Sequence, residues 1–599
     1  MHVSQDDRTV FISSDGGEQK IQSQPGETLL TCLQSAGVYL PALCGGQGTC
    51  GKCKIQVVSG FLEPSPVDRV HLSEADLQGG FRLACTAYPT EALSIHLPET
   101  GEQAFQGINR FEPGNTVITT MHPEAISLEK SRLSFTRQVD KAAQSRISLN
   151  ALVQISKLAD KMGKDAPVYV YRDKGTIVHI SERPQDLYVI GIDIGTTTIA
   201  FALVNVHTGQ IPGRLSMVNK QRKFGADVIS RIQQAQGGAL PDLSQSVRKQ
   251  ITQGIATLCR NHGIDTQDVG KIAIAANTTM IHLLLGLSCN TLGQYPFTPV
   301  TLDMVSFNYG EVFEGNLTCE VVILPGISTY VGADIVSDIL FAEMYQTQEP
   351  ELLIDIGTNG EMALATAGKI LCTATSAGPA FEGGNIRWGT GSVPGAIASV
   401  IYQDGRFTIT TIENHPPIGI CGSGVVDIVY QGLKNGLILP NGRFNQTSAA
   451  LSRHEKASDD KPLPITDLFL AQTEDAQDIT FCQKDVRELQ LAKSAIRSGI
   501  DALLHHAGLG YDAIKTLFIA GGFGYNLNFD SGAGIGLIPR ALKPKVKLIG
   551  NSALGGTVRY LLNPDNETTL NTIVDISEEY SLPEDRYFND IFIDNIDFE

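Results

Sequence analysis

The chain lacks any long hydrophobic run. No stretch of about eighteen apolar residues occurs in its sequence, and the amino-terminal segment has no cationic start followed by an apolar core. Neither a membrane-spanning helix nor a secretory leader is expected, so the sequence predicts a cytoplasmic protein with no membrane partner. A hydrophobic share of 42% is ordinary for globular protein, and 599 residues can fill the cores of several domains.

Basic charge is also scarce. The 46 Lys and Arg residues are outnumbered by 64 Asp and Glu residues, which gives a formal net charge of −18, and no run of Lys or Arg occurs. Binding to nucleic-acid phosphates requires clustered cations. The composition therefore argues against a nucleic-acid partner.

Most of the 11 cysteines are scattered, but four have the spacing of ligands. Cys44, Cys50 and Cys53 lie within ten residues of one another with the pattern C-x5-C-x2-C, and Cys85 follows. Four thiolates, three of them from one glycine-rich loop, are typical of a [2Fe–2S] cluster. The spacing is one residue longer than in plant-type ferredoxins and favours the adrenodoxin kind. The others lack ligand spacing, as expected for reduced thiols: Cys32, Cys259, Cys289, Cys319, Cys372, Cys421 and Cys482.

A zinc site and four buried thiols remain the alternatives for this cysteine group. Structural zinc sites usually contain two separated C-x2-4-C pairs, and only Cys50 and Cys53 form such a pair. The sequence contains no C-x2-C-x2-C-x3-C-P motif, so no second cluster is expected.

Residues 1–100 have the pattern of a β-grasp [2Fe–2S] ferredoxin domain. A hairpin is expected over residues 9–21, a helix over 28–36 with Cys32 as a core residue, and strands over 54–58 and 93–97. Residues 101–120 have the composition of a linker. Residues 121–186 predict a small α+β spacer domain, with a helix capped by Ser148, a hairpin, and His179 in a structural role.

A second motif occurs twice in the rest of the chain. An apolar strand delivers Asp193 to a Gly-Thr-Thr-Thr turn, and another delivers Asp355 to Gly-Thr-Asn-Gly before Glu361; each turn leads into a second apolar strand. Alone, such a hairpin could be an ordinary tight turn. Two copies predict two subdomains that face each other across one nucleotide, whose phosphate carries Mg²⁺. The expected phosphate contacts are Gly195, Thr196, Thr197, Thr198, Gly357, Thr358, Asn359 and Gly360, with Asp193, Asp355 and Glu361 as catalytic carboxylates.

Two glycine-rich segments complete the predicted nucleotide site. A buried strand ends at residues 521–524 after a long helix over 486–507, and Gly422 opens another helix. Such turns let adenine and ribose approach the backbone. The residues assigned to this part are Gly422, Ser423, Gly424, Gly521, Gly522 and Phe523.

These elements together resemble the superfamily of acetate and sugar kinases, heat-shock chaperones and actin. Within it, a ferredoxin domain, a spacer and this ATPase body over 187–599 resemble the reductive activators of corrinoid proteins, as does the segment 376–397, SAGPAFEGGNIRWGTGSVPGAI. The resemblance predicts an α+β multidomain fold with a duplicated actin-like α/β domain. The chain lacks the carboxyl-terminal [4Fe–4S] pair of some members and fits the [2Fe–2S] branch.

The resemblance implies an ATP-hydrolysing enzyme that passes one electron from its cluster to Co(II) of a corrinoid protein, restoring Co(I) in a methyltransferase system. Its implied partners are that protein and a low-potential electron donor, with a homodimer left open. Ser376, Arg387, Trp388 and Ser392 are candidates to approach the cobalt. The tail 587–599 is expected to pack on its own domain, with a docking arm as the alternative.

Three other functions remain open. An activator of another low-potential enzyme would use the same ATPase body. A ferredoxin-type carrier or redox sensor would leave the second half of the chain idle. A small-molecule kinase would explain the phosphate loops but not the fused cysteine motif.

Overall fold

The structure is a computed structural model. It describes residues 8–14, 17–23, 25–35, 40, 48, 53–97, 111, 123–129, 131–140, 145–161, 167–173, 175–446, 467–524, 527–563 and 565–599. No helix in these ranges is long and apolar enough to cross a membrane.

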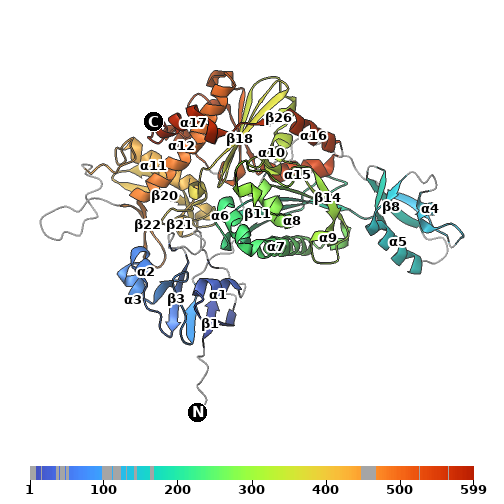
Figure 1. Cartoon of the computed structure of the whole chain (residues 1–599), viewed down its shortest axis with the longest axis horizontal. Coiled ribbons are helices and arrows are strands. Elements are labelled where there is room, and N and C mark those ends of the chain that lie inside the picture. The colour runs from blue at the N-terminus through green and yellow to red at the C-terminus, as the bar shows by residue number, and fades with distance from the viewer. Residues whose placement is uncertain are drawn as a thin grey trace, which may run out of the picture.

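The amino-terminal residues form a five-stranded β-grasp sheet, drawn in blue in Figure 1, with the order β2-β1-β5-β3-β4. β1 pairs in parallel with β5, and the other pairs are antiparallel. Val10 and Ile12 point into the core while Phe11 between them is exposed, which is the alternation of a one-sided strand. The elements are β1 (Thr9–Ser14), β2 (Gly17–Gln22), α1 (Leu29–Ser35), β3 (Lys54–Ser59), α2 (Pro66–His71), α3 (Glu74–Gln78), β4 (Phe81–Leu83) and β5 (Leu93–His96).

The spacer is a separate four-stranded sheet with the order β6-β8-β9-β7, which lies at one side of the molecule (Figure 1). Ser148 caps its main helix, since its hydroxyl accepts a hydrogen bond from the Ala151 amide at 3.1 Å. The elements are β6 (Glu124–Ser127), α4 (Phe135–Val139), β7 (Arg146–Ile147), α5 (Leu149–Lys161), β8 (Pro167–Asp173) and β9 (Thr176–Ser181).

His179 has the structural role predicted for it. Its two ring nitrogens lie 2.8 Å and 3.0 Å from the side-chain amides of Gln154 and Gln185, and burial lowers its pKa to about 4. Gln185 also donates to Asp268 of the body at 2.7 Å, which ties the spacer to the first large sheet.

The body contains two six-stranded sheets, β12-β11-β10-β13-β15-β14 and β25-β24-β16-β17-β18-β26. Five strands correspond when the second order is read in reverse, while β14 and β26 lie at opposite edges. In each, three consecutive strands form an antiparallel meander, and the first of them pairs in parallel with a later strand, β13 or β24. This repetition is the predicted duplicated α/β fold. The first sheet comprises β10 (Tyr188–Ile194), β11 (Thr198–Asn205), β12 (Gly213–Val218), β13 (Val269–Ala276), β14 (Val305–Asn308) and β15 (Glu320–Ile323). The second comprises β16 (Glu351–Ile356), β17 (Gly360–Thr366), β18 (Lys369–Thr375), β24 (Thr516–Ala520), β25 (Val546–Gly550) and β26 (Ser577–Glu579).

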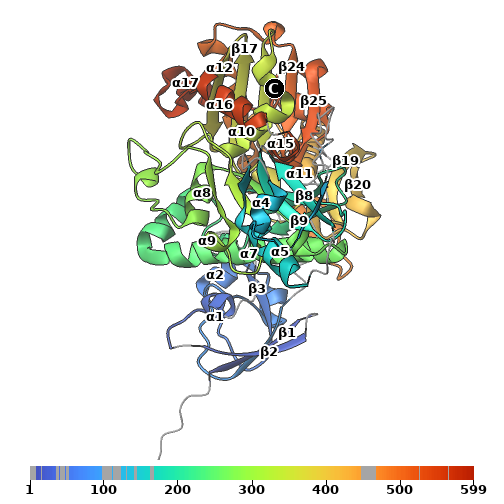
Figure 2. The same ribbon diagram turned by 90° about the vertical axis from the view of Figure 1, so that its right-hand side faces the viewer.

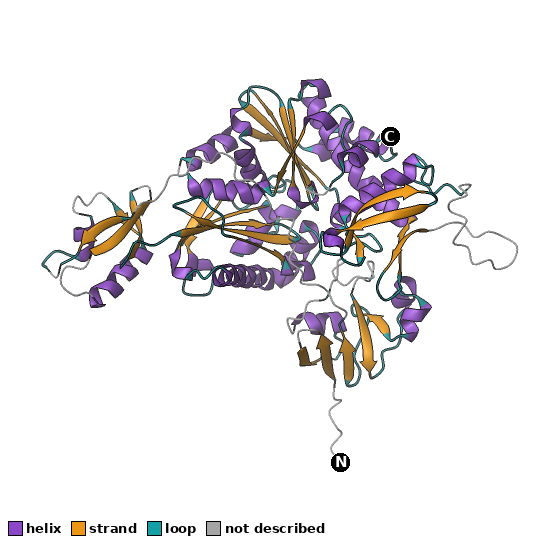
Figure 3. Ribbon diagram, turned by 180° about the vertical axis from the view of Figure 1, so that it is seen from behind, coloured by secondary structure: helices purple, strands orange, loops and turns teal. Residues whose placement is uncertain are grey.

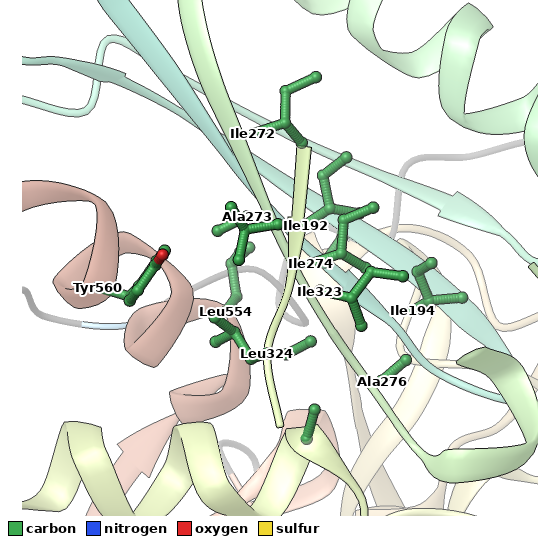
Figure 4. Packing of buried hydrophobic residues seen from close by; sticks show 14 of the residues in the cluster. Ile192, Ile194, Ile272, Ala273, Ile274, Ala276, Ile323, Leu324, Leu554 and Tyr560 are labelled. Atoms are coloured by element: carbon green, nitrogen blue, oxygen red, sulfur yellow. The ribbon is translucent and has the colours of Figure 1, made fainter. Parts of the chain in front are cut away.

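Helices lie between the two large sheets (Figure 3). Two of them, α10 (Ala333–Ala342) and α15 (Ser552–Leu562), pack against each other there (Figure 2). The contact is close because a glycine lies at the crossing. A Cβ on Gly556 would lie 2.2 Å from the Ser337 carbonyl oxygen, and one on Gly191 of β10 would lie 2.4 Å from the Thr557 hydroxyl. Figure 4 shows Leu554 of α15 next to Ala273 of β13, near isoleucines of β10 and β13. Helix α15 follows β25 of the second sheet but packs on the first sheet, so it links the two halves.

The remaining helices and two small sheets surround this frame. The helices are α6 (Val228–Gln234), α7 (Leu240–Asn261), α8 (Thr278–Leu285), α9 (Tyr309–Val312), α11 (Gly422–Lys434), α12 (Gln483–His506), α13 (Gly521–Gly524), α14 (Phe529–Gly534), α16 (Asn566–Ile576) and α17 (Arg586–Asp594). The small sheets are formed by β19 (Ala396–Gln403), β20 (Arg406–Thr411) and β21 (Gly419–Ile420), and by β22 (Asp467–Gln472) and β23 (Asp478–Cys482).

The carboxyl-terminal tail packs on its own domain, as expected. The buried Lys493 ammonium of α12 donates to the Asp597 carbonyl at 2.7 Å and lies 5.5 Å from the centre of the Phe598 ring. The Phe598 amide donates to the Pro440 carbonyl at 2.8 Å. The tail therefore joins α12 to the segment that follows α11.

Phe598→Ala is expected to destabilise the body by about 3–5 kcal/mol, because it empties a buried ring site and uncovers Lys493. Urea unfolding followed by the fluorescence of the single tryptophan, Trp388, measures this. Ile593→Ala is the matched control: Ile593 is 70% exposed on α17, so its loss should change stability by less than about 0.5 kcal/mol. Equal effects of the two variants would contradict the packing of the tail.

Candidate functional site

Two of the four predicted cluster ligands lie in the described residues, and the fold brings their backbones together. Cys53 directly precedes β3 and is 1% exposed; Cys85 follows β4 and is 6% exposed. The Ala84 amide donates to the Cys53 carbonyl at 2.8 Å, which sets the two loops side by side. Cys44 and Cys50 lie outside the described residues. The described half of the site thus fits a buried cluster, with thiols held in an apolar setting.

Helix α2 fixes the loop that carries Cys85. Ser65 and Asp68 form a capping box at its start, and the buried Asp68 carboxylate also accepts a hydrogen bond from the Leu83 amide at 2.7 Å. At the other end of α2, His71 donates to the Gly48 carbonyl at 2.9 Å. Gly48 has a φ of 75°, and a Cβ there would lie 3.1 Å from Val67, so glycine suits this position. Helix α2 was not expected from the sequence, although its Ser-Pro-Val-Asp start is a capping signal.

The two predicted phosphate loops meet in the body. Each is a tight turn between paired strands: the Gly195 amide donates to the Thr198 carbonyl and the Gly357 amide to the Asn359 carbonyl, both at 2.9 Å. The Thr197 hydroxyl lies 3.2 Å from the Thr358 hydroxyl. The repeat therefore brings the loops into direct contact, as expected for two loops that share one nucleotide.

A glutamate that the sequence analysis did not assign lies between the loops. Glu382 accepts hydrogen bonds from the Thr197 hydroxyl at 2.8 Å and the Thr358 hydroxyl at 2.7 Å, both on the same carboxylate oxygen, Oε2. It belongs to a single 3₁₀ turn, Pro379–Glu382, within the segment 376–397. The segment was recognised in the sequence, but nothing local indicated that this side chain reaches both loops.

Carboxyl groups gather around the loops. Burial, with a smaller contribution from nearby carboxylates, raises the pKa of Asp193 to about 7 and that of Asp355 to about 8. Burial also raises the pKa of Glu361, with Asp334 and Asp355 adding to the effect. The structure brings all three predicted catalytic carboxylates into this group and adds Asp334 and Asp338 of α10, whose pKa values are also raised by burial.

Some of these carboxylates could contact Mg²⁺ that a nucleotide carries. Within the described ranges, no three Asp, Glu, His or Cys side chains are arranged to bind a metal ion. Mg²⁺ in nucleotide enzymes is commonly bound by one or two carboxylates, water and the phosphates themselves. Asp193 and Asp355, both half-buried, remain the candidates for this role.

Two asparagines at helix starts were also missed. Asn551 caps α15 and donates to Asp193 at 2.9 Å; Asn277 caps α8 and donates to the Thr196 hydroxyl at 3.2 Å. Each follows a parallel strand of its sheet. An asparagine after an apolar strand and before a helix is a recognisable capping signal. Its contact with the first phosphate loop could not be predicted, because Asp193 and Thr196 are distant from the two asparagines in sequence.

Arg231 holds the backbone of the first phosphate loop. It is fully buried and donates to the Thr196 carbonyl at 2.5 Å and the Gly225 carbonyl at 3.0 Å. Burial lowers its pKa to about 9, which leaves it cationic at neutral pH. A buried positive charge beside this loop favours an anion next to it.

The predicted adenosine elements come together next to Asp355. Gly521 has a φ of 85°, and a Cβ on it would lie 2.4 Å from the Asp355 carboxylate. The expected glycine-rich turn is the one-turn helix α13. A Cβ on Gly422 would lie 1.9 Å from the Phe381 carbonyl, and Phe523 packs on Phe381 with ring centres 4.7 Å apart. Ser423 and Gly424 are buried in α11, so these residues shape the wall of the site through the backbone.

The four residues predicted to approach cobalt are not all equally accessible. Ser376 is exposed, and Ser392 and Trp388 are half-buried, with Trp388 packed against the core of the second sheet. Arg387 is held by Asp467 at 2.9 Å and through its amide by Asp485 at 2.8 Å. Their role toward cobalt stays a prediction.

The raised pKa values predict a loss of stability with rising pH. A carboxyl whose pKa is higher in the folded than in the unfolded chain contributes stability at low pH and loses it as pH rises through the folded value. For Asp355 this window runs from about pH 4 to about 8, at up to about 1.4 kcal/mol per pH unit.

Thermal unfolding between pH 5 and pH 8, without added nucleotide, tests this. The midpoint of the parent should fall across the range, and that of Asp355→Asn should fall less. Parallel curves for the two proteins would show that Asp355 does not titrate in this window.

Comparison with known proteins covers nearly the whole chain. The family model described as the 2Fe-2S iron-sulfur cluster binding domain matches residues 12–90, the RACo middle region matches 188–347, and the C-terminal domain of RACo, the ASKHA domain, matches 349–599. The middle region and ASKHA models thus correspond to the first and second large sheets.

Individual proteins agree with these models. The chain is 28% identical to the corrinoid activation enzyme RamQ of Eubacterium limosum over 97% of this chain and 98% of RamQ. It is 23% identical to a Methanosarcina barkeri protein named [Co(II) methylated amine-specific corrinoid protein] reductase, over 66% and 73% of the two chains. A solved structure titled reductive activator for corrinoid,iron-sulfur protein matches 98% of each chain with a TM-score of 0.72 and 28% identity. The chain belongs to the reductive activators of corrinoid proteins.

Proposed function

We propose that this protein uses ATP to drive the one-electron reduction of a Co(II) corrinoid protein to Co(I) in a methyltransferase system. The observation that supports this most is that one chain joins a cysteine motif held in a ferredoxin fold to two phosphate loops that touch, at Thr197 and Thr358. A carrier alone would not need the loops, and a kinase would not need the cysteines.

Each half has a separate task in this proposal. Cys44, Cys50, Cys53 and Cys85 hold the [2Fe–2S] cluster, which when reduced supplies the single electron that Co(II) takes up. The loop amides and hydroxyls hold the phosphates of ATP, while Asp193 and Asp355 hold the water shell of Mg²⁺ and orient the attacking water. Glu361, beside Asp355, keeps the second loop in place through Asn359 at 3.2 Å.

The need for ATP follows from the size of the uphill step. Each 100 mV of unfavourable potential costs one electron about 2.3 kcal/mol. A nucleotide that only changes a binding equilibrium supplies about 1–3 kcal/mol, so it offsets roughly a hundred millivolts. A larger gap requires rearrangement driven by hydrolysis or a change in the ligands of cobalt. We favour the latter, with the activator bringing a polar group near the metal.

Docking that depends on nucleotide tests the proposal. The complex between the full chain and a Co(II) corrinoid protein should differ in Kd between Mg·ADP and a non-hydrolysable Mg·ATP analogue, because a ligand drives a conformational step only by binding two states unequally. Anaerobic titration by calorimetry measures both constants. The same Kd with both nucleotides and with none would contradict ATP coupling.

A further inference from the structure

Glu382 competes with a nucleotide for the same hydrogen-bond donors. Each hydroxyl has one proton, and Thr197 and Thr358 both donate theirs to Glu382 Oε2. The second phosphate loop also lies close to the other Glu382 oxygen, because a Cβ on Gly357 would be 4.0 Å from Oε1. A carboxylate here takes the donors that a terminal phosphate would use, and its charge repels that phosphate.

We propose that Glu382 is the residue that senses the terminal phosphate of ATP: the phosphate displaces its carboxylate from Thr197 and Thr358, and the displaced turn moves the segment that carries Trp388. This rests on the proposed nucleotide site and gives that site a specific output. Glu382 acts as a positioning residue, holding the loops together until the phosphate replaces it.

The backbone that precedes Glu382 is suited to such a movement. Gly378 and Gly383 flank the Pro379–Glu382 turn with φ values of 75° and 76°. A Cβ on Gly378 would meet no atom within 4 Å, so this position has room to rotate. Gly378 is therefore the pivot, whereas Gly383 is closely packed, since a Cβ there would lie 2.3 Å from the Thr390 carbonyl oxygen.

The residues after Gly383 form a tight unit that would move together. A Cβ on Gly389 would lie 1.8 Å from the Gly383 carbonyl, so the segment closes on itself with no space between. The Ile420 amide donates to the Trp388 carbonyl at 2.7 Å, and the Thr390 amide donates to the Ile420 carbonyl at 2.9 Å. A shift of Glu382 is therefore passed to Trp388 and β21 and is not absorbed by a loose loop.

The turn also contacts the adenosine side of the site. Phe381 is 2% exposed and packs on Phe523 of α13, while Arg387 links the segment to Asp467 of β22. Figure 1 draws β21 and β22 on the side of the body toward the ferredoxin sheet. One short turn thus touches both phosphate loops and the adenosine elements, and it leads to the surface strands of that side.

Nucleotide selectivity gives the first test. Glu382→Gln keeps the shape and removes the charge, so it should tighten binding of a non-hydrolysable Mg·ATP analogue at least about tenfold relative to Mg·ADP, which lacks the competing phosphate. Glu474→Gln, an exposed glutamate in a turn, is the matched control and should leave the ratio unchanged. An unchanged ratio in Glu382→Gln, or selectively weaker binding of the analogue, would overturn the proposal.

Fluorescence of Trp388 gives a second test that needs no activity, since it is the single tryptophan of the chain. In the parent, the Mg·ATP analogue should shift its emission and Mg·ADP should not. Glu382→Gln should show the shifted emission before nucleotide is added, and Thr358→Val, which removes one donor from the opposite side, should do so as well. An unshifted emission in both folded variants would overturn the proposal.

The results separate this inference from the proposed function. If the parent binds neither nucleotide, both fall together. If the parent binds them and activates its corrinoid partner, but Glu382→Gln changes neither the selectivity nor the emission, only the role of Glu382 is wrong.

Discussion

Asp355→Asn is expected to hydrolyse ATP at least about a hundredfold more slowly than the parent when the corrinoid partner is present. Asp355 lies at the end of β16, beside Gly521 of the adenosine side, with its pKa raised to about 8 by burial and neighbouring carboxylates. The amide keeps the size of the side chain but removes the charge that would balance Mg²⁺. Turnover should therefore fall far more than stability. Asp193→Asn should behave in the same way on the first loop.

Asp427→Asn is the matched control for both variants. Asp427 is a buried carboxylate of α11 that accepts from the Ser399 hydroxyl at 2.6 Å and is not part of the carboxyl group around the loops. The Asp427→Asn variant should hydrolyse ATP at nearly the parent rate. Steady-state phosphate release measures all three. Parent-like rates in both loop variants would show that the paired Asp-Ile-Gly-Thr hairpins do not form the ATPase site.

Cys53→Ser is expected to lose the [2Fe–2S] cluster and with it all electron delivery. Cys53 is almost fully buried directly before β3, so a serine there offers a harder, protonated ligand in an apolar site. ATP binding should remain, because the phosphate loops lie in a different sheet. Iron and sulfide analysis of anaerobically purified protein, together with its visible absorption, measures the loss.

Cys32→Ala is the control for this variant. Cys32 is equally buried in the same domain, on α1, but lies outside the ligand pattern, so its loss should leave the iron content unchanged. The cluster assignment fails if the parent instead contains one zinc per chain and no visible charge-transfer bands.

The phosphate loops could be predicted from sequence because their signal is local. An apolar strand, a carboxylate, a glycine turn and a second strand occupy adjacent residues, and their repetition shows that two such units face each other. The ferredoxin strands and the cap at Ser148 are local in the same sense. Their boundaries in the structure differ from the expected ones by only a few residues.

The partners of these loops could not be predicted, because the fold brings them from far along the chain. Asn551 contacts Asp193 across 358 residues, and Glu382 contacts Thr197 across 185. The segment around Glu382 was recognised by its resemblance to a family signature, and four of its other residues were the candidates to approach cobalt. Which of its side chains would face the nucleotide depended on the turn between Gly378 and Gly383, which only the structure shows.

The most direct test of the central claim follows both redox centres in one reaction. The chain is reduced anaerobically, freed of excess reductant, and mixed with a Co(II) corrinoid protein and Mg·ATP while the spectra of cluster and corrinoid are recorded together. The account predicts that the cluster is oxidised as Co(I) appears, one electron for one cobalt, and that this is fast with Mg·ATP and slow with Mg·ADP or without nucleotide. Equal rates with and without ATP would contradict it and leave an electron carrier attached to an ATPase fold that does not drive the transfer.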